Sequence, residues 1–373
     1  MKISIVIPCY NAEHYLCECL DSIMQSDSGL VEIICVDDYS TDNTISIVET
    51  YCEKYDNIIL IKHAENKGTL EARRSGSFAA SGDYILYVDP DDRLASGGLK
   101  KLAQSLEKNG VDILCFGHTA FGACDDRKLQ WNKFSSGHLN IRSREHLLDA
   151  VFRPKPKMPW SLCVCAWRRE LIIEALNEMP YGYCVFCEDG CMFFVLCNKA
   201  QRVNFLDSII YEYRGDSGIT SHMRVLDWDT IEANLRSLSY IVRFGSGECA
   251  RVGRIYWTYF EMMCVEGIRS RIFSKLKRYD DKKELLREEY FSKDNMAGML
   301  YLIMFEQERT WERRMNLLKP FWIFKFLLII ARSCMGLRKK LSSGIDAKIR
   351  YQILHDEYKL MAKYMSLKGK AVW

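Results

Sequence analysis

The stretch GDYILYVDPDD, residues 82–92, is the clearest single indication of the fold. Its middle part, Tyr84 to Val88, is a continuous apolar run, as expected of a parallel strand that is covered on both faces. Three aspartates and a proline follow directly, and residues of these types end a strand and begin a turn. Similar apolar runs, each followed by polar residues, occur at residues 3–7 and 31–36. Together these runs predict parallel strands whose carboxyl ends carry polar side chains.

Helical patterns separate the apolar runs and predict an α/β fold. We expect helices over residues 12–24, 43–55, 69–79 and 98–108, and further strands over residues 58–61 and 111–116. This alternation favours a doubly wound α/β sheet. The pattern loosens after Gly117, and residues 118–138 have the composition of a long loop or an irregular sub-sheet. Helix formers dominate afterwards, so we expect residues 225–373 to be mostly helical.

Composition narrows the classes of function. The chain of 373 residues has a net charge of +3, which gives no reason to expect a nucleic-acid partner. The N-terminal apolar run is ended by Pro8 and is too short for a secretory signal, so we expect a cytoplasmic protein with reduced thiols.

Among the 16 cysteines, Cys184 and Cys187 have the spacing of a metal-ligand pair. A structural zinc site usually has a second pair at some distance, so we favour small apolar core residues in the stretch from Cys184 to Cys197.

The polar residues at the predicted strand ends should meet in one crevice, because ligands of an open α/β sheet bind outside the carboxyl ends of its strands. They are Pro8, Cys9, Tyr10 and Asn11 after the first strand, Asp37 and Asp38 after the second, and Asp89, Asp91 and Asp92 after the fourth. Carboxylates that share a crevice repel one another. A Mg²⁺ or Mn²⁺ ion shared with a nucleotide diphosphate would relieve this repulsion, since both ions prefer oxygen ligands. The alternative is that Asp91 and Asp92 are only turn residues.

Six segments of the chain, in this order, resemble the motifs of the family 2 glycosyltransferases with a GT-A fold. They are IVIPCYNAEHYLCECLDSI (5–23), IICVDDYSTDNT (33–44), NKGTLEARRSG (66–76), GDYILYVDPDD (82–92), FCEDGCMFF (186–194) and YEYRGDSGITS (211–221). The resemblance covers about residues 1–222 and implies an inverting enzyme that uses nucleotide-diphosphate sugars. With the helical region it predicts a glycosyltransferase domain at 1–224, divided into a nucleotide-binding half at 1–117 and an acceptor half at 118–224, and a C-terminal extension at 225–373.

The resemblance assigns five residues to the nucleotide pocket. Asp38 matches the aspartate that reads the nucleobase in this family, typically at uracil N3, which favours UDP as the nucleotide. Pro8, Tyr10 and Asn11 would line the same pocket. Arg73 matches the basic residue close to it. Donors linked to GDP or dTDP stay open, because enzymes that use them share the scaffold.

The resemblance also implies a metal and phosphate site. Asp91 would bind Mn²⁺ or Mg²⁺, with Asp89 beside the ribose and close to the metal. Arg214 would contact the phosphates of the donor. Asp92 is the weaker candidate, because its side chain suits a cap of the following turn. His222 is either an additional ligand of the metal or, as we favour, an ordinary histidine.

The pair Glu188 and Asp189 resembles the acidic motif that supplies the catalytic base in this family. This match places the base at Asp189 and Glu188 beside the acceptor. In an inverting transfer the base removes the proton of the acceptor hydroxyl while that hydroxyl attacks the sugar. The alternative is a charged helix N-terminus, where acidic residues are favoured in any case. One departure from the family is the absence of a lysine between Trp160 and Trp167, and Trp160 either stacks on a sugar or packs in the core.

The most apolar stretch of the chain lies at residues 319–341. Its apolar core, residues 321–331, is too short for a membrane-spanning helix, which needs about twenty residues. Basic residues flank the core on both sides, a pattern typical of helices that lie on an anionic membrane surface. A peripheral position on the inner face of the cell membrane would follow. The alternative is a buried helix or the interface of a homodimer.

These inferences lead to one expected function. We expect transfer of a hexose or N-acetylhexosamine from a nucleotide-diphosphate sugar to a hydroxyl of a saccharide or lipid-linked saccharide in bacterial surface glycan synthesis. Transfer to a polyprenyl phosphate, which needs no strong base, is the alternative among enzymes. A nucleotide-sugar-binding module without catalysis is the alternative of another class, and the intact acidic motifs disfavour it.

Overall fold

The computed structural model of the chain describes residues 1–26, 29, 31–122, 144–152, 160–215 and 228–246, together with residues 257, 260, 261, 263, 264 and 267. The strands of this part are β1 (Ile3–Cys9), β2 (Val31–Asp37), β3 (Ile58–Lys62), β4 (Tyr84–Tyr87), β5 (Arg93–Leu94), β6 (Ile113–Phe121), β7 (Cys165–Arg168) and β8 (Val203–Arg214). The helices are α1 (Leu16–Ser26), α2 (Thr44–Lys54), α3 (Thr69–Ala79), α4 (Gly98–Asn109), α5 (Arg144–Val151), α6 (Arg169–Glu178), α7 (Glu188–Lys199) and α9 (Trp228–Ser246), with a short 3₁₀ helix at Leu162–Val164. The α/β fold predicted from the sequence is therefore confirmed.

One sheet runs through the described part of the chain, in the order β3-β2-β1-β4-β7-β6-β8-β5. Strands β1 to β4 pair in parallel, as their apolar runs predict. Strand β7 then lies antiparallel between β4 and β6. The strand expected at residues 111–116 is therefore not a neighbour of β4, and the sheet is mixed rather than fully parallel. A short apolar run such as Cys165–Arg168 carries no local signal for its direction in a sheet.

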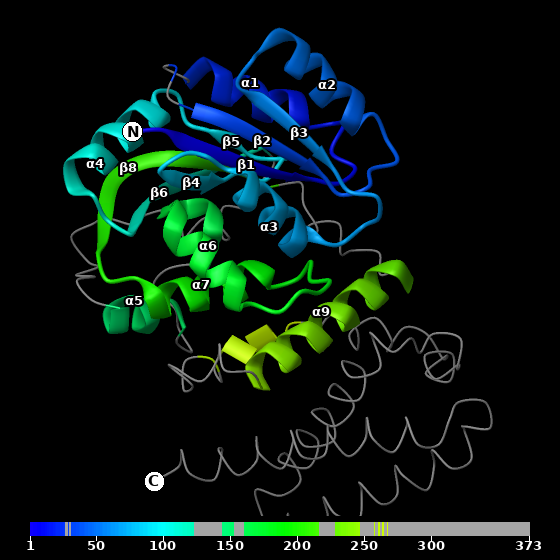
Figure 1. Cartoon of the computed structure of the whole chain (residues 1–373), viewed down its shortest axis with the longest axis vertical. Helices are drawn as coiled ribbons and strands as arrows, with labels where there is room; N and C mark the ends of the chain where they lie inside the picture. The colour runs from blue at the N-terminus through cyan, green and yellow to red at the C-terminus, as the bar shows by residue number, and fades with distance from the viewer. Residues whose placement is uncertain are drawn as a thin grey trace, which may run out of the picture. The chain divides into compact units, whose positions relative to one another are not determined.

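Helices cover both faces of this sheet (Figure 1). Helices α1, α2 and α4 lie on one face, and α3, α6 and α7 lie on the other. Each of β1, β2 and β4 is buried along its whole length, because helices cover both of its faces. The doubly wound arrangement expected for this part of the chain follows from that burial.

The parallel strands end at one edge of the sheet, which places their following residues together. Cys9 at the end of β1 lies opposite Asp37 at the end of β2. On its other side β1 pairs with β4 only up to Val6, which lies opposite Tyr87. Pro8, which has no backbone N–H, therefore falls beyond the last pair with β4. The polar residues after β1, β2 and β4 consequently face one region.

Helix α9 packs against the sheet-bearing part of the chain. Its residues Tyr240, Ile241 and Phe244 belong to the same core as β1 and α7, and so do Trp257 and Phe260. All residues that the structure describes fall in one compact unit, Met1–Gly298. The domain boundary that we place at residue 224 stays a prediction.

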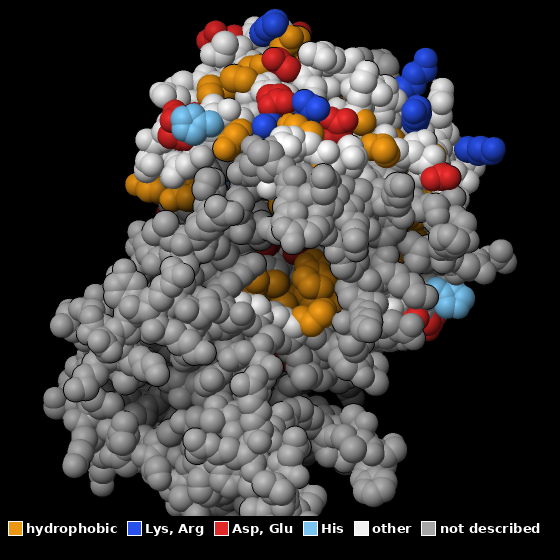
Figure 2. Space-filling model, turned by 180° about the vertical axis from the view of Figure 1, so that it is seen from behind, with side chains coloured by type: hydrophobic (Ala, Val, Ile, Leu, Met, Phe, Trp, Pro, Cys, Tyr) orange, Lys and Arg blue, Asp and Glu red, His pale blue; other side chains and the backbone are white. Residues whose placement is uncertain are grey.

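Charges of both signs are mixed over the described surface. In Figure 2 acidic and basic side chains lie interspersed on the described part of the face shown, as the small net charge suggests. No helix in the described part of the chain has the length and apolar character needed to cross a membrane. Residues 319–341 and His222 lie outside the described residues, so the membrane-surface and metal-ligand hypotheses for them stay predictions.

Candidate functional site

The turn after β4 carries Asp89, Asp91 and Asp92, and the last of these is a structural residue. Asp92 is buried, and its carboxylate accepts hydrogen bonds from the Tyr211 hydroxyl at 2.5 Å and from the Arg214 backbone N–H at 2.7 Å. Burial, followed by the charges of Asp91 and Asp89, raises the pKa of Asp92 well above its usual range. Asp92 therefore connects the turn to β8. This structural role agrees with Asp92 being the weaker candidate for a metal ligand.

Asp89 lies at the centre of the site and is only partly buried. Its backbone N–H donates to the Tyr211 hydroxyl at 3.2 Å, and its Oδ1 pairs with Arg73 Nη2 at 2.9 Å. The side chain is 35% exposed. Its Oδ2 has no hydrogen-bond partner among the described residues, so this oxygen is available to a ligand.

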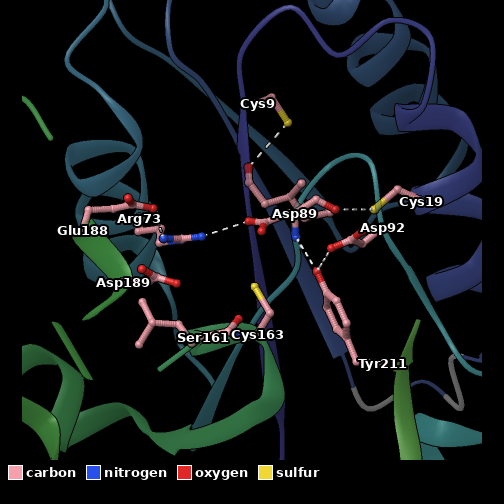
Figure 3. Close-up of polar contacts among 12 residues, drawn as sticks. Cys9, Cys19, Arg73, Asp89, Asp92, Ser161, Cys163, Glu188, Asp189 and Tyr211 are labelled. Carbon is pink, nitrogen blue, oxygen red and sulfur yellow. Dashed lines mark hydrogen bonds and ion pairs between the residues drawn. The ribbon is translucent and has the colours of Figure 1, made fainter. Parts of the chain in front are cut away.

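Arg73 joins the turn after β4 to the start of α7. It lies on α3 with its guanidinium buried, and it pairs with Asp89 Oδ1 at 2.9 Å and with Glu188 Oε1 at 2.6 Å (Figure 3). Asp89 and Glu188 are 99 positions apart in the sequence, so one cation connects two distant motifs. The structure thus places Arg73 between two carboxylates, close to the nucleotide motifs with which the sequence associates it.

The acidic pair occupies the first turn of α7. Cys187, immediately before the helix, has a left-handed backbone with φ of 60°, and Glu188 and Asp189 follow it. The start of the helix packs tightly against Phe260, because a Cβ on Gly190 would lie 2.3 Å from that ring. Both carboxylates are therefore held at fixed positions beside Arg73 (Figure 3).

The protonation of this pair is shifted by burial. Burial first, and then the charge of Glu188, raises the pKa of Asp189 to about 8, although Arg73 and the Gly190 backbone N–H act in the opposite direction. Burial also raises the pKa of Glu188 against the lowering effect of Arg73. Perturbed carboxyls of this kind are typical of functional sites. A carboxylate of raised pKa is the stronger base.

Asp38, directly after β2, is held by hydrogen bonds from the segment that leads into α3. His63 Nδ1 lies 2.7 Å from Asp38 Oδ1, and the Lys67 backbone N–H donates to the same oxygen at 2.9 Å. The Gly68 backbone N–H donates to Asp38 Oδ2 at 2.7 Å. The candidate base-reading carboxylate is therefore held in one orientation.

The turns after β1 and β2 are tied to each other. Asn11 has a left-handed backbone with φ of 49°, its N–H donates to Ser40 Oγ at 3.0 Å, and its side-chain Oδ1 accepts from the Thr41 N–H at 2.8 Å. Tyr39 also has a positive φ, of 70°, which is unusual for a bulky residue and typical of functional sites. Tyr10 is 52% exposed, so its ring is available to a ligand, while Asn11 serves the turn.

Arg214 has protein partners already. Its Nε donates to the Asp91 carbonyl at 2.8 Å, and its guanidinium pairs with Glu18. Glu18 also pairs with Arg93 Nη1 at 2.8 Å. Arg214 therefore lies next to the turn that carries Asp91, with part of its charge balanced by Glu18.

Sequence reasoning did not predict the tertiary contacts of the segment 180–187, which connects the two ends of the site. The Leu70 N–H at the start of α3 donates to the Cys184 carbonyl at 3.2 Å. From α9, the Tyr240 hydroxyl donates to the Pro180 carbonyl at 3.0 Å, and Ser237 Oγ accepts from the Val185 N–H at 3.1 Å. These partners are distant in sequence, and no local motif predicts their contacts with the segment 180–187. His63 was missed too, although its place just before the NKG motif was a usable signal.

Packing also involves other residues that the sequence singled out. Cys184, Cys191 and Cys197 are buried, as expected of core residues. Within the described residues no group of three or more His, Cys, Asp or Glu side chains has an arrangement that could hold a metal. Trp160 packs edge-on against Phe260 at a centroid distance of 5.4 Å, which favours its packing role.

Residues 4–174 match the family model described as Glycosyl transferase family 2. A curated relative, named "Uncharacterized glycosyltransferase EpsJ" of Bacillus subtilis (strain 168), is 30% identical over 212 residues, which cover 57% of this chain and 60% of that protein. The poly(ribitol-phosphate) beta-glucosyltransferase of Bacillus spizizenii is 43% identical over 116 residues, or 30% of this chain and 18% of that protein. The chain thus spans three-fifths or less of the length of these relatives.

Solved structures are similar as well. The crystal structure of S. aureus TarS 1–349 in complex with UDP matches with a TM-score of 0.48 and 23% identity, over 70% of this chain and 71% of that chain. A mannosyltransferase of Pyrobaculum calidifontis, in complex with GDP-Man and Mn²⁺, matches with a TM-score of 0.48 and 16% identity, over 83% of this chain and 87% of that chain.

Proposed function

Because residues 4–174 of this chain belong to glycosyl transferase family 2, we propose that it is an inverting glycosyltransferase. The donor is a nucleotide-diphosphate sugar, preferably a UDP-hexose or UDP-N-acetylhexosamine. The acceptor is a hydroxyl of a saccharide or lipid-linked saccharide in bacterial surface glycan synthesis. One relative is named a poly(ribitol-phosphate) beta-glucosyltransferase, and this name supports an acceptor hydroxyl on a surface polymer.

The observation that most supports this proposal is the position of Arg73. Its guanidinium contacts Asp89, which belongs to the donor motif, and Glu188, which is next to the candidate base. Donor and acceptor must meet within a few ångströms for transfer, since reacting atoms in a productive complex lie about 3–3.5 Å apart. One buried cation that contacts both motifs holds them close together, which is consistent with such a reaction.

The residues present suit a divalent metal. Asp89 and Asp91 would hold Mn²⁺ or Mg²⁺, which would neutralise the charge that develops on the departing nucleoside diphosphate. Asp89 Oδ2 has no hydrogen-bond partner among the described residues, and an oxygen of this kind is a hard ligand suited to either ion. Mg²⁺ usually takes only one or two protein carboxylates, so a set of two is sufficient.

Asp189 is the proposed catalytic base. Its raised pKa, about 8, gives it more affinity for the acceptor proton than an ordinary aspartate has. Arg73 keeps Glu188 at a fixed position beside it and offsets part of the negative charge. Around the donor, Asp38 and the exposed ring of Tyr10 would hold the nucleobase, and Arg214 would contact the phosphates.

A screen of nucleotide sugars with Mn²⁺ and with Mg²⁺ tests the proposal. We expect slow hydrolysis of one or more UDP-sugars, and faster consumption when a saccharide acceptor is present. Chelation of the metal should stop both reactions. Consumption of no nucleotide sugar under any of these conditions, together with intact nucleotide binding, would instead support a binding module without catalysis.

A further inference from the structure

We propose that His63 is a specificity-determining residue of the donor site. By filling one oxygen of Asp38, it leaves the carboxylate able to accept only one N–H from a nucleobase, which favours uracil or thymine over guanine. This inference rests on the proposed function, in which Asp38 reads the nucleobase of the donor.

The hydrogen bonds around Asp38 leave one place open. A carboxylate has about four acceptor positions, two on each oxygen. Asp38 Oδ1 is filled by His63 Nδ1 at 2.7 Å and by the Lys67 N–H at 2.9 Å. Oδ2 accepts only the Gly68 N–H, at 2.7 Å, among the described residues. One acceptor position on Oδ2 therefore remains for a ligand.

His63 is held so that it always donates to Asp38. Its side chain is 5% exposed and that of Asp38 is 4% exposed, so neither ring nor carboxylate turns freely into solvent. A ring nitrogen that faces a carboxylate must carry the hydrogen, which assigns the Nδ1–H to the bond with Asp38. At the other side of the ring, Nε2 lies 2.8 Å from Ser75 Oγ on α3. Asp38 and Ser75 thus hold the His63 ring in one orientation. Asp38 Oδ1 therefore always accepts the hydrogen bond from His63.

The backbone donors are fixed equally well. Gly68 has φ of 86°, a conformation that glycine adopts readily. A Cβ at this position would lie 3.2 Å from the Cys184 backbone nitrogen, so the segment 180–187 closes the space behind it. The Gly68 N–H therefore keeps its direction toward Asp38 Oδ2.

Nucleobases differ in the donors that they can offer to such a carboxylate. Uracil and thymine present one ring N–H between two carbonyl groups. Guanine presents two neighbouring donors, its ring N–H and its amino group, which pair with both oxygens of a free carboxylate. With Oδ1 filled, one guanine donor is left unpaired in a buried site, which weakens binding by about 10- to 100-fold. Adenine has no ring N–H at this edge and is excluded for that reason.

Titration calorimetry with UDP, dTDP and GDP, in the presence of Mg²⁺, tests the proposal. We expect the wild-type chain to bind UDP and dTDP about 10- to 100-fold more tightly than GDP. In His63→Leu, Asp38 Oδ1 keeps only the hydrogen bond from the Lys67 backbone N–H. The Asp38 carboxylate can then turn so that both of its oxygens accept from a nucleobase. This variant should bind UDP more weakly than the wild type does. Its affinity for UDP should exceed its affinity for GDP by no more than a few-fold. His63→Asn, whose side-chain amide offers an N–H close to the position of Nδ1, should restore most of the preference.

His14→Leu is the matched control, because its side chain is 79% exposed, and it should keep the wild-type preference. Thermal melting identifies any variant that does not fold. The proposal is overturned if wild-type protein binds GDP as tightly as UDP, an outcome that leaves glycosyl transfer itself intact. It is also overturned if folded His63→Leu keeps the wild-type ratio. If the wild type binds no nucleoside diphosphate, the proposed function fails as well.

Discussion

Two groups of residues, each with at least one carboxylate, lie at the two ends of the parallel strands, and their surroundings differ. At the amino end, Glu32 on β2 accepts hydrogen bonds from Lys2 Nζ, Ser4 Oγ and both polar groups of Ser81 at 2.5–2.6 Å, and from the Gly82 N–H at 3.0 Å. At the carboxyl end, Asp89, Glu188 and Asp189 share one buried arginine, Arg73.

Because their surroundings differ, the pKa values in the two groups are shifted in opposite directions. Burial alone would raise the pKa of Glu32, but the hydrogen bonds from Lys2, Ser4 and Ser81 outweigh it and lower the pKa to about 2. Burial and neighbouring charge raise the pKa of Asp189 to about 8, because fewer donors oppose them. A carboxylate surrounded by donors stabilises the fold, whereas carboxylates crowded around one cation are poised to bind or to exchange protons. The comparison thus separates Glu32, which stabilises the fold, from the carboxylates around Arg73 that we propose to take part in transfer.

Asp189→Asn should have the largest effect on the functional group. The amide cannot accept the proton of an acceptor hydroxyl, and loss of a general base typically lowers the rate about 10²- to 10⁴-fold. Donor binding measured by calorimetry should stay unchanged. Asp207→Asn, at an exposed position on β8, is the control and should transfer at the wild-type rate. A variant at Asp189 that transfers to hydroxyl acceptors at nearly the wild-type rate would point to Glu188 as the base.

Arg73→Met should destabilise the chain by about 3–5 kcal/mol at pH 7.5, because it leaves the buried carboxylate of Glu188 and the partly buried carboxylate of Asp89 without their cation. The loss should be smaller at pH 5. Without the arginine the pKa values of the folded-state carboxyls rise, so the folded state binds more protons than the unfolded state and gains stability as the pH falls. Urea unfolding at both pH values measures this. Arg202→Met, at a side chain that is 62% exposed, should change stability by less than about 0.5 kcal/mol. An equal loss at both pH values would show that packing, not charge, is responsible.

The pH dependence of transfer should follow Asp189. Only the ionised carboxylate is a base, so kcat/KM should rise about tenfold per pH unit below the pKa of about 8 and level off above it. Over the range from pH 6.5 to 8 this is about a 16-fold increase, because half of the carboxyl is ionised at pH 8. Rates of transfer to a saccharide hydroxyl, measured with saturating metal, provide the profile. A flat profile over this range would contradict the assignment of Asp189 as the base.

Glu32→Gln tests the structural group, where the expected effect is smallest. Hydrogen bonds to a charged group contribute about 1.5–3 kcal/mol, and we expect a loss of about 2 kcal/mol at neutral pH with no change in transfer chemistry. Since the pKa of Glu32 is lowered, its contribution is complete above the unfolded value of 4.5 and is lost as the pH falls through about 2. Urea unfolding of both proteins from pH 7 to pH 3 should therefore show the difference shrinking in acid. Glu49→Gln, in a pair whose side chains are 52% and 48% exposed, should be close to neutral.

The sequence by itself determined the parallel half of the sheet and the residues at its carboxyl edge. Apolar runs of strand length, separated by helical patterns, predict β1 to β4 and the helices between them because both periodicities are local properties. Helix α3 in particular was predicted with the bounds Thr69–Ala79 that the structure has. The polar residues after each strand then follow from the direction of the strands alone.

Tertiary structure decided the rest, because it depends on contacts between distant parts of the chain. The antiparallel strand β7 enters the sheet between β4 and β6 although nothing in Cys165–Arg168 specifies its neighbours. Arg73 reaches both Asp89 and Glu188, and His63 reaches Asp38 and Ser75, through space. A sequence motif names the residue types that a site requires. Only the fold decides which oxygen of a carboxylate accepts hydrogen bonds from the protein and which remains for a ligand, because the fold brings the donors to that carboxylate.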